Sequence, residues 1–142
     1  MPDGRQRRKV IFGDVDDFKS FNEKWGHSIG DAVLQEIAGR FKTSLRTSDF
    51  LGRIGGDEFL AILPGINPEG LRIVAERVRD EIAKSPLTMT PEPINGTLSL
   101  GAVVLPPKVS TIKEILTLTR SALKTSKNRS KNRVTLLEDL GK

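Results

Sequence analysis

The residues best suited to chemistry are two groups of carboxylates that lie far apart in the chain. Asp14 follows a short apolar run, with Asp16 and Asp17 close behind it. Asp57 and Glu58 lie between two other apolar runs. If strand ends bring the groups to one rim of a sheet, the carboxylates repel each other unless a cation lies between them. Proteins hold Mg²⁺ with one or two carboxylates plus substrate phosphates. The same acids are also explained by helix capping and turn formation. A metal site and a structural role therefore both stay open.

Composition excludes several other chemistries. The 142 residues include no cysteine and one histidine, which rules out a disulfide framework or a cysteine nucleophile and disfavours a zinc site. The lack of cysteine favours a reducing, cytoplasmic location. No stretch approaches the ~20 apolar residues of a membrane span. The length predicts a single domain over residues 1–142, with residues 1–9 as a basic, flexible terminus.

The charge balance favours anionic partners. Lys and Arg number 23 against 18 Asp and Glu, a net charge of +5. Nucleotides, nucleic acids and acidic lipids all suit that balance, which does not choose among them. Nucleic acid is disfavoured, because 5% aromatic residues and no tyrosine leave few platforms for stacking bases.

Hydrophobic spacing predicts five strands and four helices. The strands are expected at residues 10–14, 50–54, 58–63, 97–105 and 134–137. The helices are expected to start at caps or capping-box pairs, at Asp16 or Asp17, at Ser28 with Asp31, at Asn67 and at Thr111 with Glu114. Gly55 and Gly56 predict a tight hairpin, because such turns require the positive φ that glycine accepts. The order implies an α/β fold with a mixed, largely antiparallel sheet packed with helices.

Several short motifs occur in one order along the chain. Residues 14–19 read DVDDFK, residues 55–59 read GGDEF and residues 97–101 read TLSLG. Over about residues 10–134 they resemble the GGDEF family, the diguanylate cyclases of bacterial signalling that join two GTP molecules into cyclic di-GMP. One five-letter motif would be weak evidence, whereas several in order with the right gaps are strong. The resemblance implies the palm-like, ferredoxin-like fold of nucleotidyl cyclases.

The resemblance gives the acids roles. It implies that Asp14, the backbone carbonyl of Val15 and Asp57 hold one or two Mg²⁺ or Mn²⁺ ions, with Glu58 as an additional ligand. Such ions bridge the triphosphate and lower the pKa of the attacking 3′-hydroxyl, so that attack on the α-phosphorus expels pyrophosphate. Asp57 is the expected catalytic residue, the one that favours deprotonation.

The resemblance also implies a set of GTP contacts. Asn22 and Asp31 would read guanine, and Asp31 would accept from N1–H and N2–H₂, a pattern that adenine does not offer. From the residues alone, both would be taken as surface or capping groups. A Cβ at either glycine of the hairpin would crowd the nucleotide. The other implied contacts are Phe18, Lys19, His27, Gly55, Gly56, Lys127 and Lys131.

A second site is implied ahead of the glycine pair. Arg46 and Asp49 match the family's RxxD inhibitory site, and Arg77 matches the arginine that often completes it. An arginine fork suits the guanine or phosphate of cyclic di-GMP. A surface ion pair at a helix end is the alternative interpretation.

The chain departs from the family pattern at both ends. It starts just before the first expected strand, without the family's helical DxLTGLxNR segment. Near the C-terminus, Arg120 stands where the family has an acid, Lys124 where it has an aromatic residue, and Lys131 where it has arginine.

Two functional hypotheses follow. The first is a cyclase domain that works as a transient, antiparallel homodimer, with a regulatory sensory domain in the full protein and no membrane or nucleic-acid partner for this chain. The alternative is a catalytically silent module that binds cyclic di-GMP or GTP as a sensor.

Overall fold

The computed structural model describes residues 7–127 and 131–138, and it contains one five-stranded sheet. The strands are β1 (Lys9–Val15), β2 (Phe50–Arg53), β3 (Glu58–Ile62), β4 (Leu98–Val104) and β5 (Val134–Leu137). Their spatial order is β2-β3-β1-β4-β5, with β1 in the centre. Only β4 and β5 pair in parallel. The predicted mixed, largely antiparallel sheet is confirmed.

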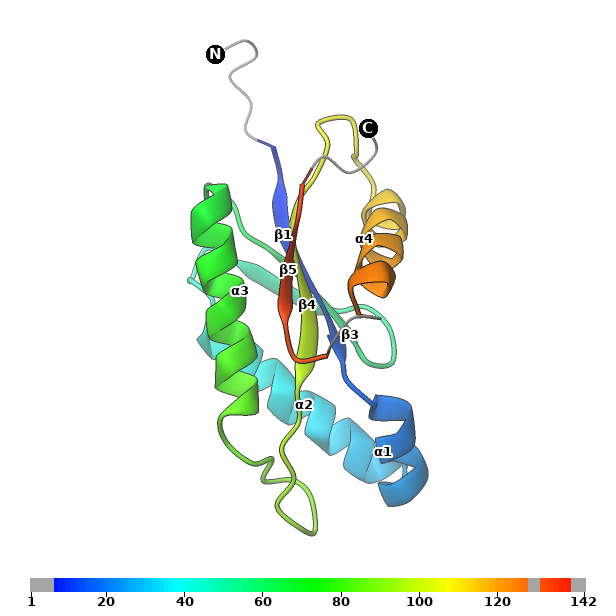
Figure 1. Cartoon of the computed structure of the whole chain (residues 1–142). Helices are drawn as coiled ribbons and strands as arrows, with labels where there is room; N and C mark the ends of the chain where they lie inside the picture. The colour runs from blue at the N-terminus through cyan, green and yellow to red at the C-terminus, as the bar shows by residue number, and fades with distance from the viewer. Residues whose placement is uncertain (1–6, 128–130, 139–142) are drawn as a thin grey trace.

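Helices cover both faces of this sheet. The helices are α1 (Phe18–Trp25), α2 (His27–Thr43), α3 (Pro68–Ala83) and α4 (Ile112–Lys127). Figure 1 shows α2 and α3 on one side of the sheet, α4 on the other, and α1 at the end of β1. None of the helices in the described part of the chain is long and apolar enough to cross a membrane.

The central strand separates two apolar clusters and ends in a polar row. Ile11 packs in the cluster beneath α2 and α3, and Phe12 packs in the cluster beneath α4. Because side chains alternate along a strand, Asp14 lies on the same side as Phe12, toward α4. Asp14 pairs in register with Glu58 on β3 and with Ser99 on β4. Opposed residues of antiparallel strands share a face, so these three polar side chains form one row across the sheet.

Two of the predicted helix starts are confirmed. Asn67 accepts a hydrogen bond from the backbone N–H of Gly70 at 2.7 Å, with Pro68 in the first helical position. The Thr111 hydroxyl accepts from the backbone N–H of Glu114 at 3.1 Å, and the Glu114 carboxylate accepts from the Thr111 N–H at 3.1 Å. Both caps follow the standard geometry for helix N-termini.

Of the other two predicted caps, Asp17 is confirmed in position and the Ser28–Asp31 box is wrong. Asp17 occupies the cap position of α1 with a φ of 60°, and its side chain makes no capping bond within the described structure. Helix α2 starts at His27, directly after Gly26 with a φ of 89°, so Ser28 already lies inside the helix. Gly26 is both the C-cap of α1 and the N-cap of α2. Ser28 therefore cannot occupy the cap position that the predicted Ser28–Asp31 box requires.

The predicted hairpin forms, but its turn is longer than the tight turn that was predicted. Within the described residues, the glycines with positive φ are Gly26 and Gly65, not Gly55 or Gly56. Residues 54–57 form a longer loop, closed by the Ile54 N–H, which donates to the Glu58 carbonyl at 2.8 Å. A Cβ at Gly55 would lie 2.8 Å from Glu58 Oε1, whereas one at Gly56 would meet no described atom within 4 Å. A Cβ at position 55 would therefore displace the flexible end of the Glu58 side chain, and backbone conformation does not explain the glycine there.

The predicted flexible terminus is corrected in its last residues. Lys9 is buried and begins β1, and its carbonyl accepts from the Leu63 N–H at 3.0 Å. The Arg8 carbonyl accepts from the Leu105 N–H at 2.9 Å. Backbone pairing with two neighbouring segments holds residues 7–9, while residues 1–6 lie outside the described part of the chain.

Candidate active site

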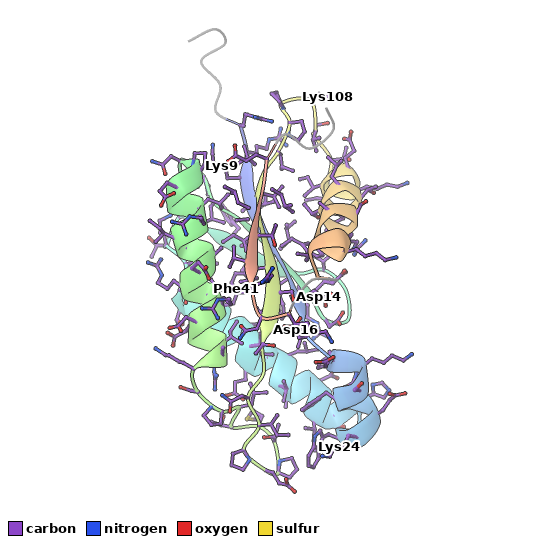
Figure 2. All side chains as sticks on the ribbon, viewed as in Figure 1. Lys9, Asp14, Asp16, Lys24, Phe41 and Lys108 are labelled. Carbon is purple, nitrogen blue, oxygen red and sulfur yellow. The ribbon has the colours of Figure 1, made fainter. Side chains whose placement is uncertain are left out.

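The two acidic groups meet where β1 ends beside the hairpin. The Val15 N–H donates to the Asp57 carbonyl at 3.1 Å, so Asp57 is held next to the end of β1. Asp14 lies opposite Glu58 in the strand ladder. All three acids are partly buried. Figure 2 shows Asp14 and Asp16 at this end of the strands, close to α1. The fold thus brings together carboxylates that are distant in sequence.

A pocket of about 420 Å³ joins the hairpin tip to α1. Its lining residues are Phe18, Lys19, Asn22, Glu23, His27, Gly56 and Asp57. All but Glu23 belong to the set implied by the family resemblance. The first turn of α1 opens here, and the N-terminus of a helix attracts anions through its backbone N–H groups and its dipole. The pocket therefore combines an anion-binding site at the first turn of α1 with the carboxylate of Asp57.

Asn22 has a buried side-chain oxygen beside this pocket. Its side-chain oxygen is inaccessible to solvent and has no hydrogen-bond partner among the described residues. Gly30 of α2 makes room for it, because a Cβ there would lie 1.9 Å from Asn22 Oδ1. The unpaired oxygen faces α2 at Gly30, while Asn22 as a whole is only partly buried and lines the pocket.

Asp31 lies outside the lining of the pocket, exposed on α2. Its nearest cationic group is the Arg53 guanidinium, at 3.9 Å. Arg53 also donates to the backbone carbonyls of Gly55 at 3.4 Å and Gly56 at 3.1 Å. The sequence analysis missed this arginine, which connects the hairpin loop with α2. Its position at the end of β2, two residues before the glycine pair, is the signal that could have identified it.

A second missed residue is Arg120 on α4. It donates to both oxygens of the Glu58 carboxylate, from Nε to Oε2 at 3.1 Å and from Nη2 to Oε1 at 2.6 Å. The side chain of Glu58 is 19% exposed and that of Arg120 is 47% exposed. Hydrogen bonding to Glu58 raises the pKa of Arg120, which remains charged. The sequence analysis noted Arg120 only as a departure from the family pattern.

Asp16 and Asp17 bind parts of the protein to one another. Asp16 accepts hydrogen bonds from Thr97 Oγ1 at 2.7 Å, Ser99 Oγ at 2.6 Å and the Asn132 N–H at 2.9 Å. The Asp17 carboxylate pairs with the Lys131 ammonium. These contacts fasten the segment between α4 and β5 against the start of α1. Lys131 therefore lies beside the anion-binding end of α1, whereas the side chain of Lys127 lies outside the described residues.

The RxxD residues form a tight pair before β2. Both oxygens of Asp49 lie 3.1 Å from Arg46 Nε, Oδ1 lies 2.7 Å from Arg46 Nη2, and Oδ2 accepts from the Arg46 backbone N–H at 2.8 Å. Arg77 instead donates twice to the Ser44 carbonyl, at 3.1 and 2.7 Å. A groove of about 640 Å³ between α2 and β2 is lined by Arg46 and Asp49, together with Phe50 and Arg53. The side chain of Asp49 is completely buried.

Carboxylates of the kind that Mg²⁺ takes together with phosphates and water lie at the end of β1. The carboxylates of Asp14, Asp57 and Glu58 are hard oxygen donors on adjacent strands. In the described residues, no three His, Cys, Asp or Glu side chains gather into a complete metal cage. Mg²⁺ requires no such cage, because it takes one or two carboxylates and completes its shell with phosphates and water.

Comparisons with known proteins identify the family of this chain. The family model for the GGDEF domain of diguanylate cyclases matches residues 3–133. Diguanylate cyclase A of Treponema denticola is 33% identical over 132 residues, which are 93% of this chain and 36% of that protein. The chain thus spans about a third of the length of the curated relatives it matches.

Solved structures agree with the sequence relatives. Diguanylate cyclase SiaD of Pseudomonas aeruginosa, in complex with its activator SiaC, has a TM-score of 0.83 at 33% identity, covering 92% of this chain and 50% of that one. The GGDEF domain of DgcB from Caulobacter crescentus, in complex with c-di-GMP, has a TM-score of 0.82 at 29% identity, covering 94% and 80%. The palm-like fold is confirmed, and the chain belongs to the GGDEF family of diguanylate cyclase domains.

Proposed function

We propose that this chain is a diguanylate cyclase domain that condenses two GTP molecules into cyclic di-GMP and two pyrophosphates. The observation that carries the proposal is the pocket between α1 and the hairpin, which is lined by the first turn of α1, by the amide-bearing Asn22 and by Asp57. Few ligands other than a purine nucleotide need an anion site, an amide reader and an acidic group in one place. The relatives named as diguanylate cyclases support the same reaction.

The acidic residues where β1 ends beside the hairpin would hold the metal. Asp14, the Val15 carbonyl and Asp57 are the proposed ligands of Mg²⁺ or Mn²⁺, with Glu58 as an additional ligand. The metal, when bound, supplies positive charge to the triphosphate and lowers the pKa of the 3′-hydroxyl. Asp57 lines the nucleotide pocket and favours loss of that hydroxyl proton, so we propose it as the catalytic residue.

The rest of the pocket would hold and orient GTP. The backbone N–H groups of Phe18 and Lys19 face the β- and γ-phosphates, and the ammonium groups of Lys19, Lys127 and Lys131 add positive charge. Asn22 and Asp31 bind the guanine edge, which places the base between α1 and α2. His27, Gly55 and Gly56 complete the set of proposed contacts.

One pocket binds one GTP, so the reaction requires two copies of the domain. We propose a transient antiparallel homodimer in which each 3′-oxygen attacks the α-phosphorus of the opposite GTP. Each attack forms one P–O bond, releases one pyrophosphate and frees one proton. A regulatory sensory domain elsewhere in the full, cytoplasmic protein would control the encounter.

Product inhibition is proposed for the groove beside β2. Arg46 lines this groove, and Arg77 lies near it through its bonds to Ser44. Asp49 serves mainly to orient the Arg46 guanidinium, because its own oxygens are already occupied. The exposed edges of the two guanidinium groups suit the guanine and phosphate groups of cyclic di-GMP.

Turnover of GTP tests the proposal. The purified chain with Mg²⁺ and GTP is expected to release pyrophosphate and cyclic di-GMP, at a rate per chain that rises with protein concentration. Asp57→Asn should abolish turnover, because an anionic group of the site is lost. Asp80→Asn, the same change on the exposed face of α3, serves as the control and should leave turnover unchanged. Full activity of the Asp57→Asn variant would refute the assignment.

A further inference from the structure

Arg120 places a positive charge beside the acidic residues that are proposed to bind the metal. It reaches from α4 to the hairpin and donates one hydrogen bond to each oxygen of Glu58. We propose, building on the function proposed above, that Arg120 is an internal cation that competes with the divalent metal for Glu58. The domain would then bind its metal fully only after the Arg120 side chain moves away.

The geometry of Glu58 supports this role. Both carboxylate oxygens are occupied by the guanidinium, in the parallel two-bond arrangement that gives arginine–carboxylate pairs their specificity. The carboxylate lies over Gly55, where a Cβ would approach Oε1 to 2.8 Å. The missing side chain at Gly55 therefore lets Glu58 occupy the position in which Arg120 binds it.

The charge of Arg120 also acts beyond Glu58. Asp14, one of the proposed metal ligands, lies directly opposite Glu58 in the strand ladder. The Arg120 guanidinium, which binds Glu58, therefore acts close to Asp14 as well. A positive charge beside a cation site weakens cation binding. Arg120 should therefore lower the affinity of the whole site for divalent metal.

The Arg120 side chain is able to leave. It is half-exposed, and within the described residues its side-chain hydrogen bonds go to Glu58. Thr119 and Leu123, which lie on the same helix, are buried. They hold α4 in place when the Arg120 side chain swings outward. Two states follow, one with Glu58 paired to Arg120 and one with Glu58 available to the metal.

Direct measurement of metal affinity tests the inference. Free Mn²⁺ would be measured by electron paramagnetic resonance during titration of the full chain with a non-hydrolysable GTP analogue present. Arg120→Gln is expected to bind Mn²⁺ about tenfold more tightly than the unmodified chain, and Arg120→Lys should fall between them. Lys113→Gln removes the same charge from an exposed site on α4 and should change the affinity little. Equal affinities for Arg120→Gln and Lys113→Gln would overturn the inference.

Two more variants separate this inference from the proposed function. In the Glu58→Gln background, the gain from Arg120→Gln should be much smaller, because the competed ligand is absent and only the through-space effect of the charge remains. Asp14→Asn should greatly weaken Mn²⁺ binding in every background if the proposed metal site is correct. Unchanged binding by Asp14→Asn would reject the site and the inference together. Weakened binding by Asp14→Asn without a gain in Arg120→Gln would reject the inference alone.

Discussion

Two arginine–carboxylate pairs lie at opposite ends of the β2–β3 hairpin. Their shortest bonds have similar lengths, but they differ in burial and in their contacts with the backbone. At the open end, Arg46 binds Asp49 with a shortest bond of 2.7 Å. At the loop end, Arg120 binds Glu58 with a shortest bond of 2.6 Å. Bond length alone would suggest equivalent roles, but the surroundings of the two pairs predict different ones.

Burial and backbone contacts separate the two pairs. Asp49 is completely buried, also accepts from the Arg46 backbone N–H, and its partner donates to the Pro64 carbonyl at 2.7 Å. Arg120 is half-exposed and joins segments 62 residues apart through side chains only. A buried, backbone-linked pair fixes local structure, whereas an exposed pair contributes little stability and opens easily. The buried Asp49 carboxylate therefore has a structural role in holding Arg46, whereas the second pair is suited to regulate a site.

The largest expected effect concerns the buried pair. Asp49→Ala should reduce the free energy of unfolding by about 2–3 kcal/mol, because the hydrogen bonds to a charged acceptor are lost together. Urea unfolding followed by circular dichroism measures the change. Asp80→Ala, on an exposed surface, should shift the midpoint very little. Equal stability of the Asp49→Ala variant and the unmodified chain would remove the contrast between the two pairs.

A third pair tests whether burial is the deciding factor. Glu36 on α2 is 13% exposed and binds Arg40, and it accepts from the N–H of Thr88 at 2.9 Å and of Met89 at 3.2 Å. Glu36→Gln should cost about 1 kcal/mol of stability at neutral pH, because a charged acceptor is replaced by a neutral one. Unfolding curves of the two proteins at pH 7 measure the difference.

The same variant predicts a pH dependence. Burial works to raise the pKa of Glu36, but hydrogen bonds from Thr88, Met89 and Arg40 outweigh it and lower that pKa below the usual 4.5. A lowered folded-state pKa gives stability that is present above 4.5 and is lost as pH falls through the folded-state value. The stability difference between the chain and Glu36→Gln should therefore shrink below pH 4.5. A difference that stays constant down to pH 2 would contradict this assignment.

The smallest expected effect concerns the exposed pair. Arg120→Gln should change the free energy of unfolding by less than about 0.5 kcal/mol, as is usual for exposed ion pairs. The same urea experiment measures it, and 1 M salt should abolish any remaining difference. A loss as large as that of Asp49→Ala would mean that Arg120 is a structural residue and not a competitor for metal.

Local signals predicted the elements that depend on local structure. The Asn67 cap and the Thr111–Glu114 box were identified correctly, because each is completed within one turn of helix. The cap position at Asp17 was also predicted, but its side chain pairs with Lys131 and makes no capping bond within the described residues. The predicted Ser28–Asp31 box failed, because Gly26 serves both helices. Helix propensities do not contain such tertiary contacts.

The site was predicted in its position more fully than in its interactions. Motif order placed Asp14 beside the hairpin, as the ladder shows. The pairing of Arg120 with Glu58 could not be foreseen, because it depends on how α4 crosses the sheet. The engagement of Arg77 by the Ser44 carbonyl also depends on tertiary packing. Residues that join distant segments become visible only when the fold is known.

The most direct test is a crystal structure of the chain with Mn²⁺ and a non-hydrolysable GTP analogue, in which anomalous scattering locates the metal. The account predicts a Mn²⁺ peak at about 2.0–2.2 Å from carboxylate oxygens of Asp14 and Asp57, with the nucleotide in the pocket between α1 and the hairpin. A bound nucleotide whose metal lies away from both carboxylates would contradict it.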